Sequence, residues 1–375
     1  MLMSVTVILF ISFLKRNVVD GCPSPCECTD TTVDCSQTGL DEIPQSISSN
    51  TTVLLLGGNT LTTVRPNALS GLPSLIKLDL KNNKLVTLPE SLFSNNTKLE
   101  TLHLENNKLV SLSGRLFSNN INLQILDLLN NMLVSLPKDL FLSNTNLKEL
   151  DLEKNKYIGS NNLVNLPKDL LFSNTNLETL YLGSNKLVSL PVGLFSNNRK
   201  LLVLGLENNM LVSLPEGLFT FNTDLRFVYL ESNNLKSLPK DLYLNTNLIT
   251  LNMNKNQFIC CLMIDFKDWA SNQTQLTYEG TCTVLNTTID IHSFNTTTCI
   301  IPGWSPWINS SCSTTCGDGV IISTRICDNP PPSDNGLKCV GSETETSLCN
   351  LQKCPASCRR SKKRIRRQTS RPLGQ

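Results

Sequence analysis

Cysteine is the residue type with the greatest capacity for chemistry in this chain, which holds 15 cysteines against 2 histidines. Unless they bind metal, so many thiols indicate disulfide bonds in an extracellular protein rather than a reducing cytosol. An odd number leaves at least one cysteine without a partner in its own chain. His103 and His292 offer little for imidazole catalysis or zinc binding, so we expect neither a metal nor a cofactor.

Closely spaced carboxylates form a second group, above all Glu149, Asp151 and Glu153. Such a set could act as an acid–base pair or as a calcium site. The repeat described next, however, places them on an open sheet, which offers no pocket to shift their pKa values. We therefore expect a solvated acidic face and no enzyme. The net charge of +2 gives no reason to expect a nucleic-acid partner.

One repeated pattern, L-x-x-L-x-L-x-x-N-x-L-x-x-L-P, supplies the elements that position these residues. Its frames begin at Thr51, Leu75, Leu99, Leu123, Leu147, Leu177, Leu201, Leu225 and Leu248. This is the signature of leucine-rich repeats. The L-x-L core predicts a short strand of a parallel sheet, whose inward leucines are buried only when repeats stack. The predicted fold class is an α/β repeat, a leucine-rich repeat solenoid shaped as a horseshoe with a concave parallel β-sheet.

Two further columns of the repeat predict how the solenoid is held together. A buried asparagine where the chain leaves each strand can satisfy backbone groups that lack sheet partners. These asparagines are Asn59, Asn83, Asn107, Asn131, Asn155, Asn185, Asn209, Asn233 and Asn256. An inner aromatic spine is predicted from Phe93, Phe117, Phe141, Phe195 and Phe219, with Leu171 and Tyr243 in place of Phe in two repeats.

Cysteine clusters flank the repeats, where a solenoid needs covers for its apolar ends. The first contains Cys22, Cys26, Cys28 and Cys35, and the second contains Cys260, Cys261, Cys282 and Cys299. They resemble the N- and C-terminal caps of extracellular leucine-rich repeat proteins. That resemblance implies pairs 260–282 and 261–299. The family usually has C-x-C where Cys260 and Cys261 are adjacent here, so their pairing stays open, and zinc is the alternative use of such clusters.

The segment 302–355 has no leucine repeats and closely resembles a thrombospondin type 1 repeat, through Trp304-x2-Trp307, Cys312-x3-Cys316-Gly317 and further cysteines. The resemblance implies the disulfide pairs Cys312–Cys349, Cys316–Cys354 and Cys327–Cys339. It also implies Trp rings stacked on Arg325, in a ladder shortened because Ser323 stands where another Arg is common. Sugar attachment is implied at Thr315 and Trp304. Cys358 is left unpaired, which suggests a disulfide-linked homo-oligomer.

Ligand binding is expected on the strand positions between the inward leucines, because these positions face solvent on the concave sheet. Acids dominate this surface, aromatic residues gather near its later repeats, and the scaffold columns stay nearly constant while these columns vary. The candidate ligand-binding residues are Asp79, His103, Glu105, Asp127, Glu149, Asp151, Glu153, Tyr181, Phe227, Tyr229 and Glu231. Free drift of exposed positions is the alternative, against which exposed aromatic side chains argue.

Loops and sequons add to this interpretation. Six extra residues, Tyr157 to Asn162, follow the asparagine of the fifth repeat near the acidic centre, either as part of the binding face or as a tolerated insertion. N-glycosylation sequons start at Asn50, Asn95, Asn272, Asn286, Asn295 and Asn309. If occupied, the four in the C-terminal cap and the domain junction would leave the central concave face free.

The two ends of the chain suggest secretion and processing. Residues 2–14 are mostly apolar but too short to span a membrane, and they fit a signal peptide. The last 17 residues, from Arg359, carry eight Lys/Arg and no acid. This tail is predicted to be disordered, and it could bind heparan sulfate or be cleaved after Arg364-Ile365-Arg366-Arg367.

The expected domains are a signal peptide (1–21), an N-terminal cap (22–50), leucine-rich repeats (51–256), a C-terminal cap (257–299), a thrombospondin type 1 repeat (302–355) and a basic tail (356–375). The whole resembles Slit-like proteins and variable lymphocyte receptors. This resemblance implies extracellular recognition or adhesion: a protein or glycan ligand on the concave face, an immune-type role, and matrix or cell-surface attachment through the C-terminal region. The alternative is a structural matrix or guidance component without a concave ligand.

Overall fold

The structure is a computed structural model that describes residues 22–153, 163–284, 287–299, 302–332, 339 and 341–353. They form two compact units, one reaching Thr283 and including Thr288–Phe294, the other comprising Val284–Thr287 and the chain from Asn295. Within these ranges no helix is long and apolar enough to cross a membrane. Several predictions fall outside the described residues: the signal peptide, Asn155, the insertion Tyr157–Asn162, Asn286, Cys354, Cys358 and the basic tail.

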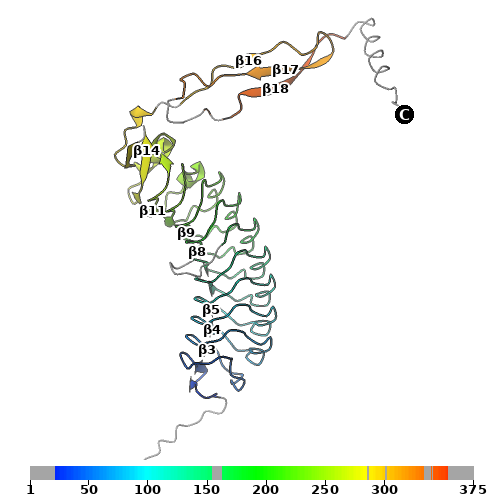
Figure 1. Cartoon of the computed structure of the whole chain (residues 1–375), viewed down its shortest axis with the longest axis vertical. Helices are drawn as coiled ribbons and strands as arrows, with labels where there is room; N and C mark the ends of the chain where they lie inside the picture. Colours follow the sequence, from blue (N-terminus) through cyan, green and yellow to red (C-terminus); the bar gives the residue numbers. More distant parts are fainter. Residues whose placement is uncertain are drawn as a thin grey trace, which may run out of the picture. The chain divides into compact units, whose positions relative to one another are not determined.

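The first unit is a solenoid whose repeats each contribute one three-residue strand to a 12-stranded sheet. The strands stack along the inner side of the curve in Figure 1. All neighbours are parallel except β1 and β2. The sheet contains β1 (Glu27–Thr29), β2 (Thr32–Asp34), β3 (Val53–Leu55), β4 (Lys77–Asp79), β5 (Thr101–His103), β6 (Ile125–Asp127), β7 (Glu149–Asp151), β8 (Thr179–Tyr181), β9 (Val203–Gly205), β10 (Phe227–Tyr229), β11 (Thr250–Asn252) and β13 (Thr277–Glu279).

Buried leucines hold the repeats together, as the L-x-L spacing predicts. The middle residue of each strand and the residue after its end point into the solenoid, and Leu78, Leu80, Leu102 and Leu104 are all 0% exposed. Full burial of such a side chain stabilises the fold by roughly 1.5–3 kcal/mol. The side chains between them face the opposite side of the sheet, because neighbouring strand residues alternate. The predicted leucine-rich repeat solenoid is confirmed.

The asparagine column forms the predicted hydrogen-bond ladder. Asn131, which is 0% exposed, donates from Nδ2 to the carbonyls of Leu104 and Leu128, each at 3.0 Å, and its Oδ1 accepts from the Leu109 N–H. The preceding residue of most repeats is left-handed, with φ between 52° and 58° at Asn82, Asn106, Asn130, Ser184, Asn208, Ser232 and Lys255. Asparagine tolerates this conformation better than most residues, which explains the frequent Asn-Asn pairs.

A second ladder, which we did not predict, runs through the asparagines of the recurring LFSNN and SNT segments. Asn120 donates to the carbonyls of Phe93 and Asn96, and each such side chain bridges consecutive repeats. The members are Asn96, Asn120, Asn144, Asn174, Asn198, Asn222 and Asn245. Beside it lies the predicted phenylalanine spine, with centroids 5.9 Å apart for Phe93–Phe117 and 6.4 Å for Phe117–Phe141.

Disulfides and aromatic contacts close both ends of the solenoid. Cys22 bonds Cys28 and Cys26 bonds Cys35 at the N-terminal end. At the other end Tyr243, the spine residue of the last repeat, stacks on Trp269, with centroids 5.6 Å apart. The elements here are η1 (Lys240–Leu244), β12 (Phe258–Ile259), η2 (Cys260–Leu262), α1 (Ile264–Ala270), β14 (Thr281–Val284), β15 (Thr287–Asp290) and η3 (Thr296–Thr298).

The cysteines of the C-terminal cap are all in disulfides. Cys260 pairs with Cys282, as the resemblance implied, despite the adjacency of Cys260 and Cys261. Cys261 and Cys299 are each disulfide-bonded as well, while their pairing with each other stays a prediction. The cap therefore uses these cysteines as covalent cross-links.

The second unit holds a three-stranded antiparallel sheet of β16 (Ile308–Asn309), β17 (Asp318–Thr324) and β18 (Thr344–Asn350). Cys312 bonds Cys349 and Cys327 bonds Cys339, and Cys316 is also in a disulfide. The Arg325 guanidinium lies 4.4 Å from the Trp304 ring centroid and 4.3 Å from that of Trp307. One arginine between two indoles is the short cation–π ladder expected from the sequence.

Candidate functional site

The concave face is organised in rows, because the parallel strands pair in register. The last residues of β4 to β11 form one such row, which contains Asp79, His103, Asp127, Asp151, Tyr181, Gly205, Tyr229 and Asn252. The repeat spacing puts these positions on one surface, and the register places them side by side. The row changes character at β8, from charged side chains to aromatic side chains and glycine.

Asp79, at the N-terminal end of this row, already has a partner. Its carboxylate lies 3.3 Å from the Lys81 ammonium and accepts the Lys81 N–H at 2.9 Å. The Asp79 side chain is 9% exposed. The charge of Asp79 is thus compensated within the protein, and ligand binding by Asp79 stays a prediction.

His103, Glu105 and Asp127 converge on one point of the face, and we name them the histidine cluster. Nδ1 of His103 lies 3.7 Å from Oε2 of Glu105 and 4.0 Å from Oδ2 of Asp127. Burial lowers the pKa of His103. Burial and the nearby Asp127 raise the pKa of Glu105 to about 7. The cluster thus holds two carboxylates beside an imidazole that tends to be neutral.

Carboxylates further along the sheet are also less solvated than the sequence suggested. Burial raises the pKa of Asp151 to about 7, with smaller contributions from Asp127 and Glu153, and burial raises the pKa of Glu153. The expectation that an open sheet leaves these pKa values unshifted is wrong. Side chains on adjacent short strands shield each other, so the surface desolvates them without an enclosed pocket. Glu149 lies on the same strand as Asp151 and is exposed.

Two glycines lie beside this acidic region. Gly205 lies between Tyr181 of β8 and Tyr229 of β10 in the register. A Cβ at Gly205 would lie 2.9 Å from Cδ1 of Tyr181 and 3.1 Å from Oε2 of Glu207, and a Cβ at Gly183 would overlap the Glu207 carboxylate. The tyrosine ring and the carboxylate therefore occupy space that exists because these two residues lack side chains.

Glu207 has no basic partner among the described residues. Its Oε2 is buried and has no hydrogen-bond partner. Burial raises the pKa of Glu207 to about 7, and the repulsion of Glu153 and Glu231 adds to this. Phe227 and Tyr229 lie half-buried on the adjacent strand. We call Tyr181, Gly183, Gly205, Glu207, Phe227 and Tyr229 the aromatic–glycine patch.

The structure adds Glu207, Gly183 and Gly205 to the candidate residues derived from the sequence. Their signal was present, since glycine replaces a larger side chain at concave positions of two consecutive repeats. Glu231, which was among the candidates, accepts a hydrogen bond from Asn252 at the edge of the patch. The structure thus brings Tyr181, Phe227, Tyr229 and Glu231 together and sets them apart from the histidine cluster.

The expected glycosylation positions are accessible where the structure describes them. The sequon asparagines Asn50, Asn95, Asn272, Asn295 and Asn309 are exposed, as is Thr315. Trp304 is half-buried and stacks on Arg325. Attachment of sugars at these residues remains a prediction.

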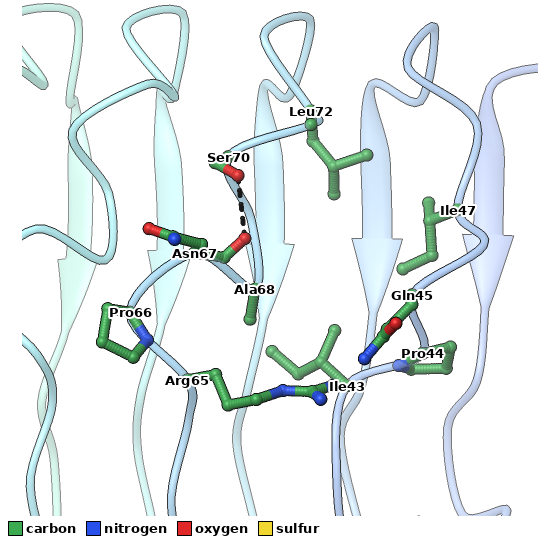
Figure 2. Close-up of a pocket in the computed structure, with 11 residues that line it drawn as sticks. Ile43, Pro44, Gln45, Ile47, Arg65, Pro66, Asn67, Ala68, Ser70 and Leu72 are labelled. Atoms are coloured by element: carbon green, nitrogen blue, oxygen red, sulfur yellow. Dashed lines mark hydrogen bonds between the residues drawn. The ribbon is translucent and has the colours of Figure 1, made fainter.

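A separate cavity of about 600 Å³ lies between the N-terminal cap and the first repeat. Figure 2 shows Arg65 reaching across its floor toward Gln45, with Ile43 and Leu72 above and beside it. Arg65 also pairs with Glu42 at 3.4 Å. No strand residue of the sheet lines this cavity, and its single charged lining residue has a partner.

Known families match the N-terminal cap, most of the repeats and the thrombospondin-like segment. The leucine rich repeat family matches residues 49–109, 74–132 and 97–156, and the BspA type leucine rich repeat region matches 168–260. The leucine rich repeat N-terminal domain matches 21–48, and the thrombospondin type 1 domain matches 303–354.

Curated relatives match over short segments. Human semaphorin-5A is 42% identical over 77 residues, which are 20% of this chain and 7% of that protein. Human "A disintegrin and metalloproteinase with thrombospondin motifs 16" is 54% identical over 52 residues, 14% of this chain and 4% of that protein. The chain therefore spans only a small fraction of these relatives.

Solved structures match the first unit more broadly. A leucine-rich repeat protein of Leptospira interrogans is 30% identical with a TM-score of 0.56, covering 67% of each chain. A chain from an octameric complex of Latrophilin 3, Unc5D and FLRT2 covers 69% of this chain and 92% of its own, with a TM-score of 0.55; its 21% identity indicates the fold alone. The chain belongs to the leucine-rich repeat proteins, with an N-terminal cap and, following the repeats, a thrombospondin type 1 domain.

Proposed function

We propose that this protein recognises an extracellular protein partner through the aromatic–glycine patch, where a basic side chain of the partner meets Glu207. Leucine-rich repeats combined with a thrombospondin type 1 domain and disulfides indicate extracellular protein recognition or adhesion. The patch gives that general role a specific place on the concave face.

The single observation that carries the proposal is the Glu207 carboxylate, which has a buried oxygen without a partner beside two glycines. Leaving a buried acceptor unsatisfied costs roughly 1–3 kcal/mol, and more if it is charged. A guanidinium or ammonium from a partner would remove this cost. Its hydrogen bonds to a carboxylate would be charge-assisted, and Tyr181 and Tyr229 would offer ring faces to the cation.

The chemistry of the surroundings favours a basic protein segment over an acidic one. Glu153 and Glu231 contribute to the raised pKa of Glu207, so the local potential is negative. Aromatic residues beside a charged group are typical of residues that dominate binding energy at protein interfaces. The glycines let the Tyr181 ring and the Glu207 carboxylate lie close against the strands, side by side.

A binding screen with a matched pair of variants tests this proposal. The full secreted chain is immobilised and probed with a library of secreted and cell-surface ectodomains, and each hit is titrated against Glu207→Gln and Asp224→Asn. Asp224 is an exposed acid outside the strands, so its substitution removes the same charge from a neighbouring repeat.

We expect Glu207→Gln to weaken binding by about 10-fold or more, because a desolvated charged contact contributes about 1.5–3 kcal/mol. Asp224→Asn should leave the affinity within about 2-fold of the wild type. Equal affinities of the two variants for every hit would refute the proposal. Recognition by an immune-type mechanism and attachment through the C-terminal region stay predictions from the sequence.

A further inference from the structure

The histidine cluster has a donor set and a geometry that the aromatic–glycine patch lacks. One imidazole nitrogen and two carboxylates approach one another, with ligand atoms all within 4.8 Å. The three side chains are largely buried, at 24% exposure for His103, 12% for Glu105 and 21% for Asp127. They come from β5, from the turn after it and from β6, so a rigid part of the sheet positions all three.

Two of the donor atoms have no hydrogen-bond partner. Nδ1 of His103 and Oε2 of Glu105 are buried and unsatisfied. Buried polar atoms are nearly always satisfied by protein, water or an ion, so two orphans that face the same point require an explanation. A single ion between them would satisfy both.

Lys81 does not fill this role. Its ammonium lies 3.3 Å from Asp79, and its charge is therefore engaged on the neighbouring strand. The cluster offers one imidazole nitrogen and two carboxylate groups to a single cation.

We propose that His103, Glu105 and Asp127 form a binding site for a divalent transition-metal ion, of which Zn²⁺ is the representative. Imidazole nitrogen with carboxylate oxygen suits zinc and its neighbours, while calcium and magnesium prefer all-oxygen sites. Zinc with ligands at about 2.0–2.2 Å holds them about 3.3–3.6 Å apart. The observed 3.7 Å and 4.0 Å from the imidazole nitrogen need only small side-chain adjustments to reach that spacing.

The site would leave a coordination position open toward the concave solvent. Three protein ligands are one fewer than the usual four of zinc. Water, or a carboxylate or imidazole of a bound partner, could complete the shell. The metal would bind a carboxylate or imidazole of a partner, whereas Glu207 is proposed to bind a basic side chain. The metal site does not depend on the proposal for Glu207.

Metal binding is measured on the full secreted chain in the absence of any partner. The chain is treated with chelator, dialysed against micromolar Zn²⁺ at about pH 7.5, and its bound zinc is determined by mass spectrometry. His103→Ala and the isosteric variants Glu105→Gln and Asp127→Asn each remove one ligand. Asp224→Asn is the control, because it removes an exposed acid that lies outside the strands and away from the cluster's own repeats.

The wild type and Asp224→Asn should bind about one more Zn²⁺ per chain than each ligand variant. Zinc should raise the melting temperature of the wild type and of Asp224→Asn, but not of Glu105→Gln. Millimolar Ca²⁺ should not displace the zinc. Equal zinc content in all four cluster and control variants would overturn the proposal, as would stabilisation by Ca²⁺ and not by Zn²⁺. Because no partner is present, these results are independent of binding at Glu207.

Discussion

The two halves of the concave face share one scaffold and differ in how they hold acid groups. In β4 to β7, carboxylates lie beside a histidine and beside one another, and one of them pairs with a lysine. In β8 to β10, two glycines let Tyr181 and the Glu207 carboxylate pack against the strands, and the aromatic residues Phe227 and Tyr229 follow on β10. The difference shows that repeats with a shared scaffold can bear different side chains, and hence different chemistry, at their solvent-facing strand positions.

The largest expected effect tests what the two halves have in common. Asn131→Ala and Asn209→Ala remove equivalent members of the asparagine ladder, one from each half. Each leaves backbone groups of two repeats unsatisfied, so we expect each to lower the free energy of unfolding by about 2–4 kcal/mol. Urea denaturation followed by circular dichroism measures both. Losses that differ by more than about 2 kcal/mol would contradict a shared scaffold.

A smaller effect should be confined to the aromatic–glycine patch. Gly205→Val places a branched side chain against the Tyr181 ring and the Glu207 carboxylate. We expect a loss of about 1–3 kcal/mol from overpacking and the loss of any ligand held by the patch. Thr250→Val, at a half-buried position of β11 that already bears a Cβ, is the control and should change stability by less than about 1 kcal/mol. If Gly205→Val proves as stable as this control, the close approach of Tyr181 is not maintained in solution.

The pH dependence of stability distinguishes Glu207 from an ordinary surface acid. Its pKa is raised from 4.5 to about 7 in the folded protein, so between these values the folded chain keeps a proton that the unfolded chain has released. The free energy of unfolding should therefore fall as pH rises through this window. Glu207→Gln removes that dependence and should be more stable than the wild type by about 1–2 kcal/mol at about pH 8.

At about pH 4 the Glu207 carboxyl of the wild type is protonated, so neither it nor the glutamine of the variant carries a charge. Glu207→Gln and the wild type should then have almost the same free energy of unfolding. Thermal melts at the two pH values, with Asp224→Asn alongside, provide the measurement. A stabilisation that is equal at both values would mean that the raised pKa is not its cause.

The smallest expected effect concerns Asp79, the β4 carboxylate that pairs with Lys81. Lys81 is 43% exposed and pairs with Asp79 across 3.3 Å. Lys81→Ala should cost only about 0.5 kcal/mol, because the lysine member of the pair is exposed and its charge is screened by water and salt. Denaturation at low and high salt checks this, since the difference from the wild type should shrink at high salt. A loss above about 2 kcal/mol would show that the Asp79 carboxylate needs Lys81 as a partner far more than the exposure of Lys81 suggests.

The repeat spacing predicted the scaffold well, because each recurring position of the repeat has one structural role. The position of Asn131 follows from the need to satisfy backbone groups at the strand end, and the stacking of Phe93 on Phe117 follows from the repeat length. The second asparagine ladder was overlooked although the recurring SNN and SNT segments contain it. Its buried amides show that a constant polar residue inside a repeat is a structural signal.

The candidate sites were less predictable, because they depend on side-chain rotamers and on positions where glycine has no side chain. Sequence placed His103, Glu105 and Asp127 on one face, but their convergence depends on rotamers and on the lateral register of β5 and β6. Glu207 was not among the candidate ligand-binding residues, because its environment depends on the missing side chains of Gly183 and Gly205. Desolvation of Asp151 likewise comes from neighbouring repeats and not from its own segment.

A crystal structure of the chain bound to an ectodomain partner from the screen tests the central claim most directly. The account predicts an arginine or lysine of the partner within about 4 Å of the Glu207 carboxylate, beside Tyr181 and above Gly205. A partner bound to the loops outside the sheet, or to the thrombospondin type 1 domain with Glu207 left facing solvent, would contradict it.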